Sequence, residues 1–278
     1  MSAITSMEEK NKLIKHILQS HTINISKYDD NFLMKSIQRR MSETGCKTLG
    51  DYNSFVLKDI NEAGWFIDSL QVCYTEFFRN TLTFSVLEKI IIPSLVMRTL
   101  KSNRNEIRVW SAACASGQET YSIAMLLNEF STVKGKKINF RIFATDQSEL
   151  QILEAKLGRY TEKELNSVSL KRVNQWFTKS DATYDVKPQL KEYIEFSVFD
   201  LLNEEYSCPP TSIYGDFDLV ICSNLLFYYQ PEYRKKIIEK VNHCMSENGY
   251  LVTGESEREI LNQCGLREMY PMSGIFHI

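Results

Sequence analysis

The chain has 278 residues, which is enough for one large domain and a smaller one. Its 33 basic residues nearly balance its 35 acidic residues, so the overall charge gives no reason to expect nucleic acid or an anionic membrane as a partner. The seven cysteines form no Cys-x-x-Cys pair, which argues against a zinc site and a disulfide framework and favours a reducing, cytoplasmic setting.

The first part of the chain has a helical pattern. Apolar residues recur there every three or four positions, which is the period of one face of an α-helix. The stripes comprise Leu13, Ile14, Ile17 and Leu18, then Phe32, Leu33, Ile37 and Met41, and then Tyr52, Phe55 and Val56. We therefore expect residues 1–70 to form a small all-helical domain. The start of the chain has no apolar core followed by a small-residue cleavage site, so no signal peptide is expected.

Residues 71–105 are expected to form a linker and a connecting helix. A helix is predicted over Phe84–Leu100, with Pro93 either near its middle or dividing it in two, because proline donates no backbone hydrogen bond. The most apolar segment of the chain, Ile90–Met97, lies within this helix. It is far shorter than the roughly 20 residues that span a membrane, so we expect no membrane insertion.

After Arg104 the pattern changes to strands that alternate with helices. This alternation predicts an α/β domain over residues 106–278, in which a parallel sheet has helices on both faces. Strands are predicted at Glu106–Trp110, Asn139–Thr145, Tyr193–Phe199, Phe217–Ser223 and Gly249–Thr253, and helices at Gln118–Phe130, Ser148–Lys156 and Pro231–Met245.

Two segments depart from this alternation. The stretch Gly158–Lys191 is longer than a plain crossover, which predicts a small subdomain inserted at about residues 158–192. Near the end of the chain, Arg267–Met269 and Ile275–Ile278 flank a turn-like segment, which resembles a hairpin at the edge of the sheet.

A loop of small residues, Ser111–Gly117, joins the first predicted strand to the helix that begins at Gln118. Small side chains let a ligand approach the unpaired amide groups at a helix start, so the unit indicates a nucleoside cofactor site. An ordinary strand-to-helix turn is the alternative. The loop has one glycine and does not match G-x-G-x-x-G, which makes a nicotinamide oxidoreductase the less favoured hypothesis.

Polar residues follow three other predicted strands. Asp146 ends one strand, Asp200-Leu201 follows the next, and Ser223-Asn224 ends a third. The carboxyl ends of parallel strands share one edge of a sheet, so these residues are predicted to converge on one crevice. Each of them alone could be a helix cap or a turn residue. Glu119, in the first turn of the helix after the loop, could favour the helix dipole or meet a cationic amine on the ligand.

Several motifs together resemble the CheR family of chemotaxis-receptor glutamate methyltransferases in order and spacing, from about Lys27 to the end of the chain. They are Thr75–Arg79, Val109–Ala113, Gly117–Ala124, Ala144–Asp146, Ile221–Tyr228 and Gly254–Glu257. The resemblance implies a Rossmann-like sheet and a methyltransferase that uses S-adenosyl-L-methionine and releases S-adenosyl-L-homocysteine. It implies methylation of glutamate side chains on the cytoplasmic helical region of chemoreceptors, which sets receptor adaptation.

The resemblance also implies roles for individual residues. Arg79 and Tyr228 are expected to be catalytic, with Arg79 on the carboxylate of the cofactor and Tyr228 near the transferred methyl group. The residues expected around the cofactor are Cys73, Thr75, Arg79, Ala113, Glu119, Asp146, Asp200, Leu201, Ser223 and Asn224. On the helical domain, Lys35, Arg39 and Arg40 match a receptor-docking helix, for which the alternative is an ordinary solvated face.

The chemistry of such a transfer makes few demands on the protein. A glutamate carboxylate, with an ordinary pKa near ~4.3, is already ionised at neutral pH and needs no general base. Alignment and exclusion of water should therefore matter more than a catalytic histidine or cysteine. Cys114 and Cys222 are accordingly interpreted as small buried packing residues.

This chain departs from the family pattern at four positions. It has Ser223 where the family usually has arginine, Gln118 and Thr120 in a motif that is usually Gly-Glu-Glu-Pro, and Cys73 where asparagine is typical. A cofactor-binding sensor or adaptor with little activity, or a small-molecule methyltransferase, therefore remains an alternative. Thr178–Tyr184 lacks the glycines of members that bind a receptor's C-terminal pentapeptide, so we expect receptor recognition that needs no such tether. We also expect the protein to be a cytoplasmic monomer.

Overall fold

The computed structural model describes residues 3–71, 74–102, 106–133, 136–212 and 214–277. The chain forms two compact units. The helical unit comprises Met1–Val72 and Phe227–Arg234, and the sheet unit comprises Cys73–Leu226 and Lys235–Ile278. Each unit is described by itself below.

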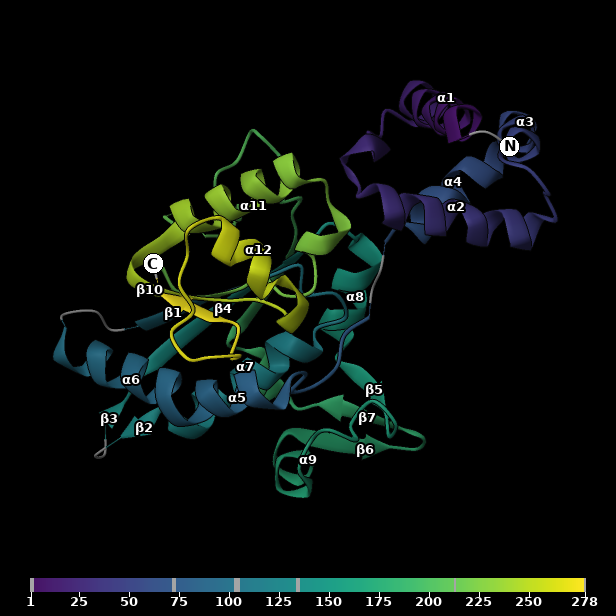
Figure 1. Cartoon of the computed structure of the whole chain (residues 1–278). Helices are drawn as coiled ribbons and strands as arrows, with labels where there is room; N and C mark the ends of the chain where they lie inside the picture. The colour runs from purple at the N-terminus through teal and green to yellow at the C-terminus, as the bar shows by residue number, and fades with distance from the viewer. Residues whose placement is uncertain (1–2, 72–73, 103–105, 134–135, 213, 278) are drawn as a thin grey trace. The chain divides into compact units, whose positions relative to one another are not determined.

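The helical unit contains the helices expected from the apolar stripes (Figure 1). They are α1 (Ala3–His21), α2 (Asp30–Thr44), α3 (Leu49–Lys58) and α4 (Ile60–Ser69). Polar side chains define their ends: Asp29 accepts hydrogen bonds from the first amides of α2, and Thr48 with Asp51 forms a capping box on α3. The apolar stripes form the core, with Leu13, Ile17, Leu33, Ile37, Tyr52 and Val56 all buried.

A distant segment, Phe227–Arg234, completes the helical unit. The amide of Asp29 donates to the carbonyl of Tyr228 at 2.8 Å, and the rings of Tyr28 and Tyr229 stack with their centroids 5.4 Å apart. The helical unit is therefore not confined to the first 70 residues, because hydrogen bonds and ring contacts attach a segment from far along the chain.

The sheet unit confirms the predicted α/β fold. In the described part of the chain its main sheet has the strand order β11-β10-β9-β1-β4-β8. All neighbours are parallel except β11, which runs antiparallel to β10. The strands are β1 (Glu106–Ala112), β4 (Asn139–Asp146), β8 (Ile194–Val198), β9 (Phe217–Ile221), β10 (Met245–Val252) and β11 (Ile275–His277).

Helices cover both faces of this sheet. In Figure 1, α11 (Pro231–Cys244) lies on one side, and α6 (Ile92–Lys101) and α7 (Gln118–Phe130) lie on the other. The helix α8 (Glu149–Leu157) follows β4, and α12 (Arg258–Gln263) follows β10. Among the described residues, no helix combines the length and the apolar character needed to cross a membrane.

The connecting segment is helical throughout residues 81–101 with Pro93 near its middle, which was one of the two predicted possibilities. A helix α5 (Thr81–Val86) leads into one π-helical turn at Leu87–Ile91, and α6 then begins with Pro93 in its first turn. Proline has no amide to donate, and Pro93 follows the π-helical turn, in which the amide of Ile92 donates to the carbonyl of Leu87.

The inserted segment forms a small subdomain, as its length predicted. It has a three-stranded antiparallel sheet of order β5-β7-β6. Its elements are β5 (Arg159–Thr161), α9 (Leu170–Trp176), β6 (Phe177–Ser180), β7 (Thr183–Val186) and α10 (Pro188–Lys191). A separate short hairpin pairs β2 (Thr132–Val133) with β3 (Lys136–Lys137).

The predicted C-terminal hairpin is only partly correct. β11 pairs with β10 over three residues, whereas the segment around Glu268 contributes one isolated bridge, to Phe276. Glu268 accepts hydrogen bonds from the amides of Met272 and Gly274 and forms an ion pair with Arg258. The segment therefore curves around this carboxylate and does not extend as a strand.

Candidate functional site

The carboxyl ends of the parallel strands lie along one edge of the sheet, and the predicted site residues follow these ends. Ser223 and Asn224 follow β9, Ala113 follows β1, Asp146 ends β4, and Asp200 comes two residues after β8. These four strands are consecutive neighbours in the sheet. The topology thus places residues from distant parts of the sequence at one edge.

A cavity of about 460 Å³ opens at this edge. Four predicted residues line it, namely Arg79, Glu119, Ser223 and Asn224. The predicted residues Thr75, Ala113, Asp146, Asp200 and Leu201 are not among the residues that line it. Cys73 lies outside the described residues. The cavity therefore covers the part of the edge formed by β9, β10 and the start of α7.

The loop after β10 lines the same cavity through Gly254, Glu255 and Ser256, which belong to the motif Gly254–Glu257 but were not among the residues predicted around the cofactor. The position of this loop could have indicated it, because the loop follows β10, the fifth parallel strand along the chain, just as Asn224 follows the adjacent strand β9. Thr83, Phe84 and Leu87 add a wall from α5 and the π-helical turn.

Arg79 is held by the segment that precedes α5. Its Nη1 donates to the carbonyl oxygen of Tyr74 at 3.1 Å, and the guanidinium lies 5.0 Å from the centre of the Tyr74 ring. The neighbouring Phe77 is fully buried between Tyr160 and Phe177, with ring centroids at 4.9 and 5.7 Å. This buried aromatic anchor fixes the segment that carries the arginine on the cavity wall.

Glu119 has an unusual protonation equilibrium. Burial raises its pKa to about 7, while hydrogen bonds from Ser111 and Ser223 and the charge of Arg79 oppose the rise. The hydroxyl of Ser111 lies 3.2 Å from Oε1 of Glu119 and accepts a hydrogen bond from Thr120 at 3.0 Å. A bound cation would favour the ionised form of this carboxylate.

Asp146 is oriented by the small-residue loop. One of its oxygens accepts the amide of Ala115 at 2.9 Å, and the other accepts the amide of Ser148 at 2.9 Å. Ala113 and Ala115 both have positive φ values, 65° and 46°, and Gly117 has 93°. A Cβ on Gly117 would also lie 3.1 Å from the Cβ of Ala155 on α8. The loop is therefore tightly wound, and small residues permit that path.

Asp200 and Leu201 form a turn beside Asp146. The amide of Phe199 donates to the carbonyl of Asp146 at 2.9 Å, and Oδ1 of Asp200 accepts the amide of Leu202 at 2.8 Å. Leu201 is buried. The two acidic residues are thus connected through the ends of the adjacent strands β4 and β8.

The two cysteines of the site region confirm their interpretation as packing residues. Cys114 and Cys222 are buried, and burial raises the pKa of both thiols well above the ordinary value. A thiol that stays protonated is a poor nucleophile.

Tyr228 belongs to the helical unit. It ends a short 3₁₀ turn over Leu226–Tyr228, and its ring contacts Phe32 on α2 with centroids 4.8 Å apart. It also contacts Phe227 with centroids 4.2 Å apart. Its expected place beside the transferred methyl group stays a prediction.

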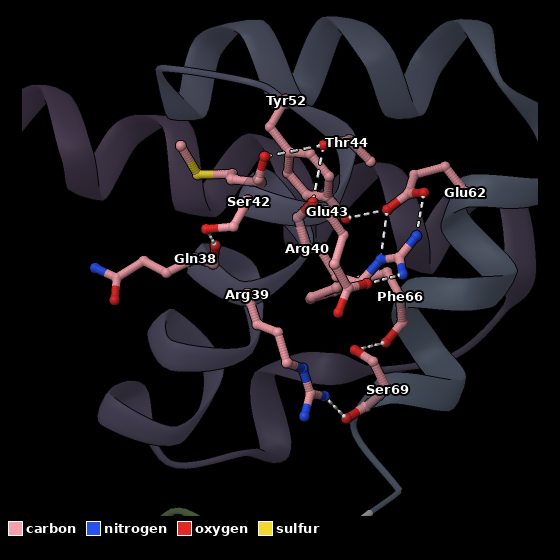
Figure 2. Close-up of polar contacts among 11 residues, drawn as sticks. Gln38, Arg39, Arg40, Ser42, Glu43, Thr44, Tyr52, Glu62, Phe66 and Ser69 are labelled. Carbon is pink, nitrogen blue, oxygen red and sulfur yellow. Dashed lines mark hydrogen bonds and ion pairs between the residues drawn. The ribbon is translucent and has the colours of Figure 1, made fainter.

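The three basic residues predicted on α2 have different environments. Lys35 and Arg39 are exposed, and Arg39 donates to the carbonyl of Ser69 at 2.7 Å. Figure 2 shows that Arg40 is directed toward Glu62 on α4, to which it donates from Nε at 2.9 Å and from Nη2 at 2.6 Å. Arg40 therefore differs from an exposed docking residue, because its guanidinium binds Glu62 within the helical unit.

Glu62 is fully buried and is the centre of this cluster. It also accepts a hydrogen bond from the hydroxyl of Tyr52 at 2.7 Å, and Arg40 pairs in addition with Glu43 (Figure 2). Burial and the hydrogen bond to Glu62 raise the pKa of Tyr52, so its hydroxyl remains a donor. The cluster joins α2, α3 and α4.

Comparison with known proteins adds independent information. The CheR methyltransferase SAM binding domain matches residues 74–270, and the CheR methyltransferase all-alpha domain matches residues 8–70. A chemotaxis protein methyltransferase of Borreliella burgdorferi is 31% identical over 258 residues, covering 90% of this chain and 88% of that protein. Chemotaxis protein methyltransferase 1 of Pseudomonas aeruginosa is 32% identical over 230 residues, covering 80% and 79%.

A third relative, from Pseudomonas putida, is 34% identical over 211 residues, covering 74% of this chain and 72% of that chemotaxis protein methyltransferase. The two matched domains correspond to the helical pattern and to the α/β pattern of the sequence. With its all-helical domain followed by a sheet domain that binds S-adenosylmethionine, the chain belongs to the CheR methyltransferase family.

Proposed function

We propose that this S-adenosylmethionine-dependent methyltransferase esterifies glutamate side chains on the cytoplasmic part of chemoreceptors. Membership of the CheR family supports methyl transfer, and the relatives that are named chemotaxis protein methyltransferases support the receptor substrate. The SAM binding domain does not favour the nicotinamide hypothesis, and the all-alpha domain does not favour a small-molecule substrate.

The observation that carries the proposal is the charge arrangement of the cavity. Arg79 and Glu119 line the same cavity and bear opposite charges when Glu119 is ionised. The amino-acid end of S-adenosylmethionine carries one carboxylate and one ammonium group, so Arg79 would hold the carboxylate and Glu119 the ammonium. Asp146, at the end of β4, would accept hydrogen bonds from the ribose hydroxyls.

The bound cofactor supplies an electrophilic methyl group on its sulfonium. The receptor carboxylate that attacks is ionised at neutral pH, so the protein needs to align it and exclude water more than to remove a proton. Arg79 is better used on the cofactor than on the attacking carboxylate, since gripping the nucleophile would stabilise the ground state most. In this scheme the residues of the chain act by binding and orientation.

The test is transfer of radiolabelled methyl groups from S-adenosylmethionine to a purified cytoplasmic receptor fragment. We expect label in the fragment that mild base releases as methanol, because esters hydrolyse under conditions that leave N-methyl and S-methyl groups intact. A matched fragment with glutamine at the acceptor glutamates should take up no label. Base-stable label, or label only in small molecules, would contradict the proposal.

Replacing Tyr228 with phenylalanine is expected to lower turnover about tenfold, since one hydrogen bond contributes roughly 1–1.5 kcal/mol. In the proposed role its hydroxyl orients the receptor carboxylate, so the affinity for S-adenosylhomocysteine should be unchanged. Methyl-transfer kinetics and calorimetry measure the two effects separately. Tyr214→Phe, at a residue that is 84% exposed, serves as the control. Weaker cofactor binding with unchanged turnover would contradict this role.

The affinity for S-adenosylhomocysteine is expected to rise with pH up to about 7 and then to level off. Burial raises the pKa of Glu119 to about 7, so below that pH most sites carry a proton that an incoming ammonium group must displace. Affinity should fall by up to about tenfold for each pH unit below 7, with a proton released on binding. Calorimetry between pH 5.5 and 8.5 in two buffers measures both, and a Glu119→Gln variant should have a flat profile.

We propose that recognition of the receptor does not require a C-terminal pentapeptide. In the inserted subdomain, β6 and β7 are joined by a tight turn, with Ser180 paired to Thr183 and Asp181 at a φ of 50°. Lys35 and Arg39 provide the proposed docking surface on α2, with the negatively charged receptor helices as the complementary surface. Receptor fragments with and without their C-terminal tail should therefore be methylated at equal rates, and a loss of rate without the tail would contradict this.

A further inference from the structure

Glu257 is a fully buried carboxylate that joins two loops at the edge of the sheet. Its Oε2 accepts the amide of Asn224 at 2.7 Å, the amide of Gly254 at 3.0 Å and the hydroxyl of Thr253 at 2.9 Å. Its Oε1 accepts the amide of Leu226 at 2.6 Å. Two of these donors lie in the loop after β9 and two in the loop after β10, so one side chain connects both loops.

The conformation of Asn224 depends on such a connection. Its φ is 59°, in the left-handed region that asparagine tolerates but does not prefer. Its amide donates to Glu257, and its side chain lies on the cavity wall. The carboxylate thereby holds a backbone conformation that the loop sequence alone would populate weakly.

Gly254 completes the arrangement from the opposite side. A Cβ at this position would lie 2.5 Å from Nδ2 of Asn224 and 2.9 Å from Oε2 of Glu257. The φ of Gly254 is −67°, a backbone conformation that any residue can adopt. Glycine is therefore needed here only because a side chain would not fit. Both loops are thus shaped around the side-chain amide of Asn224.

We propose that Glu257 is a positioning residue that holds the side-chain amide of Asn224 against bound S-adenosylmethionine. This inference rests on the proposed use of the cavity as the cofactor site. Three backbone amides and one hydroxyl directed at one carboxylate favour its ionised form. Burial raises the pKa of Glu257 and these donors oppose the rise, as expected for a carboxylate that is stabilised by the dipoles of its hydrogen-bond donors.

The test is a double-mutant cycle on the affinity for S-adenosylhomocysteine, measured by calorimetry on the full chain. Glu257→Gln keeps the size of the side chain but places an NH₂ group where amides now donate. It should weaken binding at least about tenfold in the wild-type background, and less than about threefold in the Asn224→Ala background. Glu259→Gln, an exposed glutamate on α12, is the matched control and should leave the affinity unchanged.

Equal losses of affinity in the two backgrounds, or no loss in either, would overturn the inference. If Glu257→Gln does not fold, Gly254→Ala gives a second cycle. Its Cβ should displace Asn224 and weaken binding, and Asn224→Ala should remove most of that effect by making room. Failure of the wild-type chain to bind S-adenosylhomocysteine would instead overturn the proposed cofactor site.

Discussion

Replacing Glu62 with alanine is expected to destabilise the helical unit by about 3 kcal/mol. Glu62 is fully buried and accepts hydrogen bonds from Nε and Nη2 of Arg40 and from the hydroxyl of Tyr52. Its removal leaves Nε and Nη2 of Arg40 and the hydroxyl of Tyr52 without this acceptor, while Nη1 of Arg40 keeps its pair with Glu43. Amide hydrogen exchange of α2, α3 and α4 in the full chain should accelerate on the order of a hundredfold.

Two further variants separate this pair from general effects of substitution. Lys35→Ala changes an exposed basic residue of the same helix and should leave the exchange of these helices almost unchanged. Arg40→Met combined with Glu62→Met removes both charges together and should recover most of the lost stability, since a buried pair is often replaceable by apolar residues of similar volume. Unchanged exchange in Glu62→Ala would show that the cluster contributes little to the helical unit.

This cluster changes how an arginine scan of α2, the proposed docking helix, should be interpreted. Arg40→Ala would lower receptor methylation by loosening the helical unit, without removing a receptor contact. Lys35 and Arg39, whose side chains are exposed, are the residues whose substitution would report on docking itself. Hydrogen exchange distinguishes the two causes, because Arg40→Ala should accelerate the exchange of α4 and Lys35→Ala should not.

Regular elements of this fold were predictable because their periodicity is local. The helix α7 has the predicted bounds, Gln118–Phe130, and the parallel strands begin and end within a few residues of the apolar runs. Strand ends in turn predicted which polar residues share an edge, since parallel strands point their carboxyl ends the same way. Asn224 was identified on that basis, and Glu119 from its place in the first turn of the helix after the small-residue loop; both line the cavity.

Contacts between distant segments were not predictable from such patterns. Arg40 falls on the same helix as Lys35 and Arg39, and nothing local indicates that Glu62 on α4 accepts its guanidinium. The return of Phe227–Arg234 to the helical unit depends on hydrogen bonds to a segment some 200 residues earlier, such as the one between Asp29 and Tyr228. Three of the four donors to Glu257 are backbone amides, which all residues except proline have, so no side-chain pattern indicates these partners.

Replacing Arg79 with alanine is expected to weaken binding of S-adenosylhomocysteine by about 30-fold, or roughly 2 kcal/mol, because a hydrogen bond to a charged group is lost. The affinity for methylthioadenosine, which lacks the amino-acid end, should not change. Calorimetry with both ligands therefore assigns Arg79 to the carboxylate of the cofactor and not to the nucleoside. Arg79→Lys should recover part of the affinity, since it keeps the charge but loses the planar fork.

Arg267→Ala is the control for this prediction, because it removes an exposed arginine of the sheet unit away from the cavity lining. Equal losses for both ligands would mean that Arg79 shapes the cavity as a whole, through its contact with the carbonyl of Tyr74. Lower turnover with unchanged affinity for both ligands would instead place Arg79 on the receptor carboxylate. That outcome would reverse the mechanism, since the arginine would then act on the nucleophile that the proposed mechanism leaves free to attack.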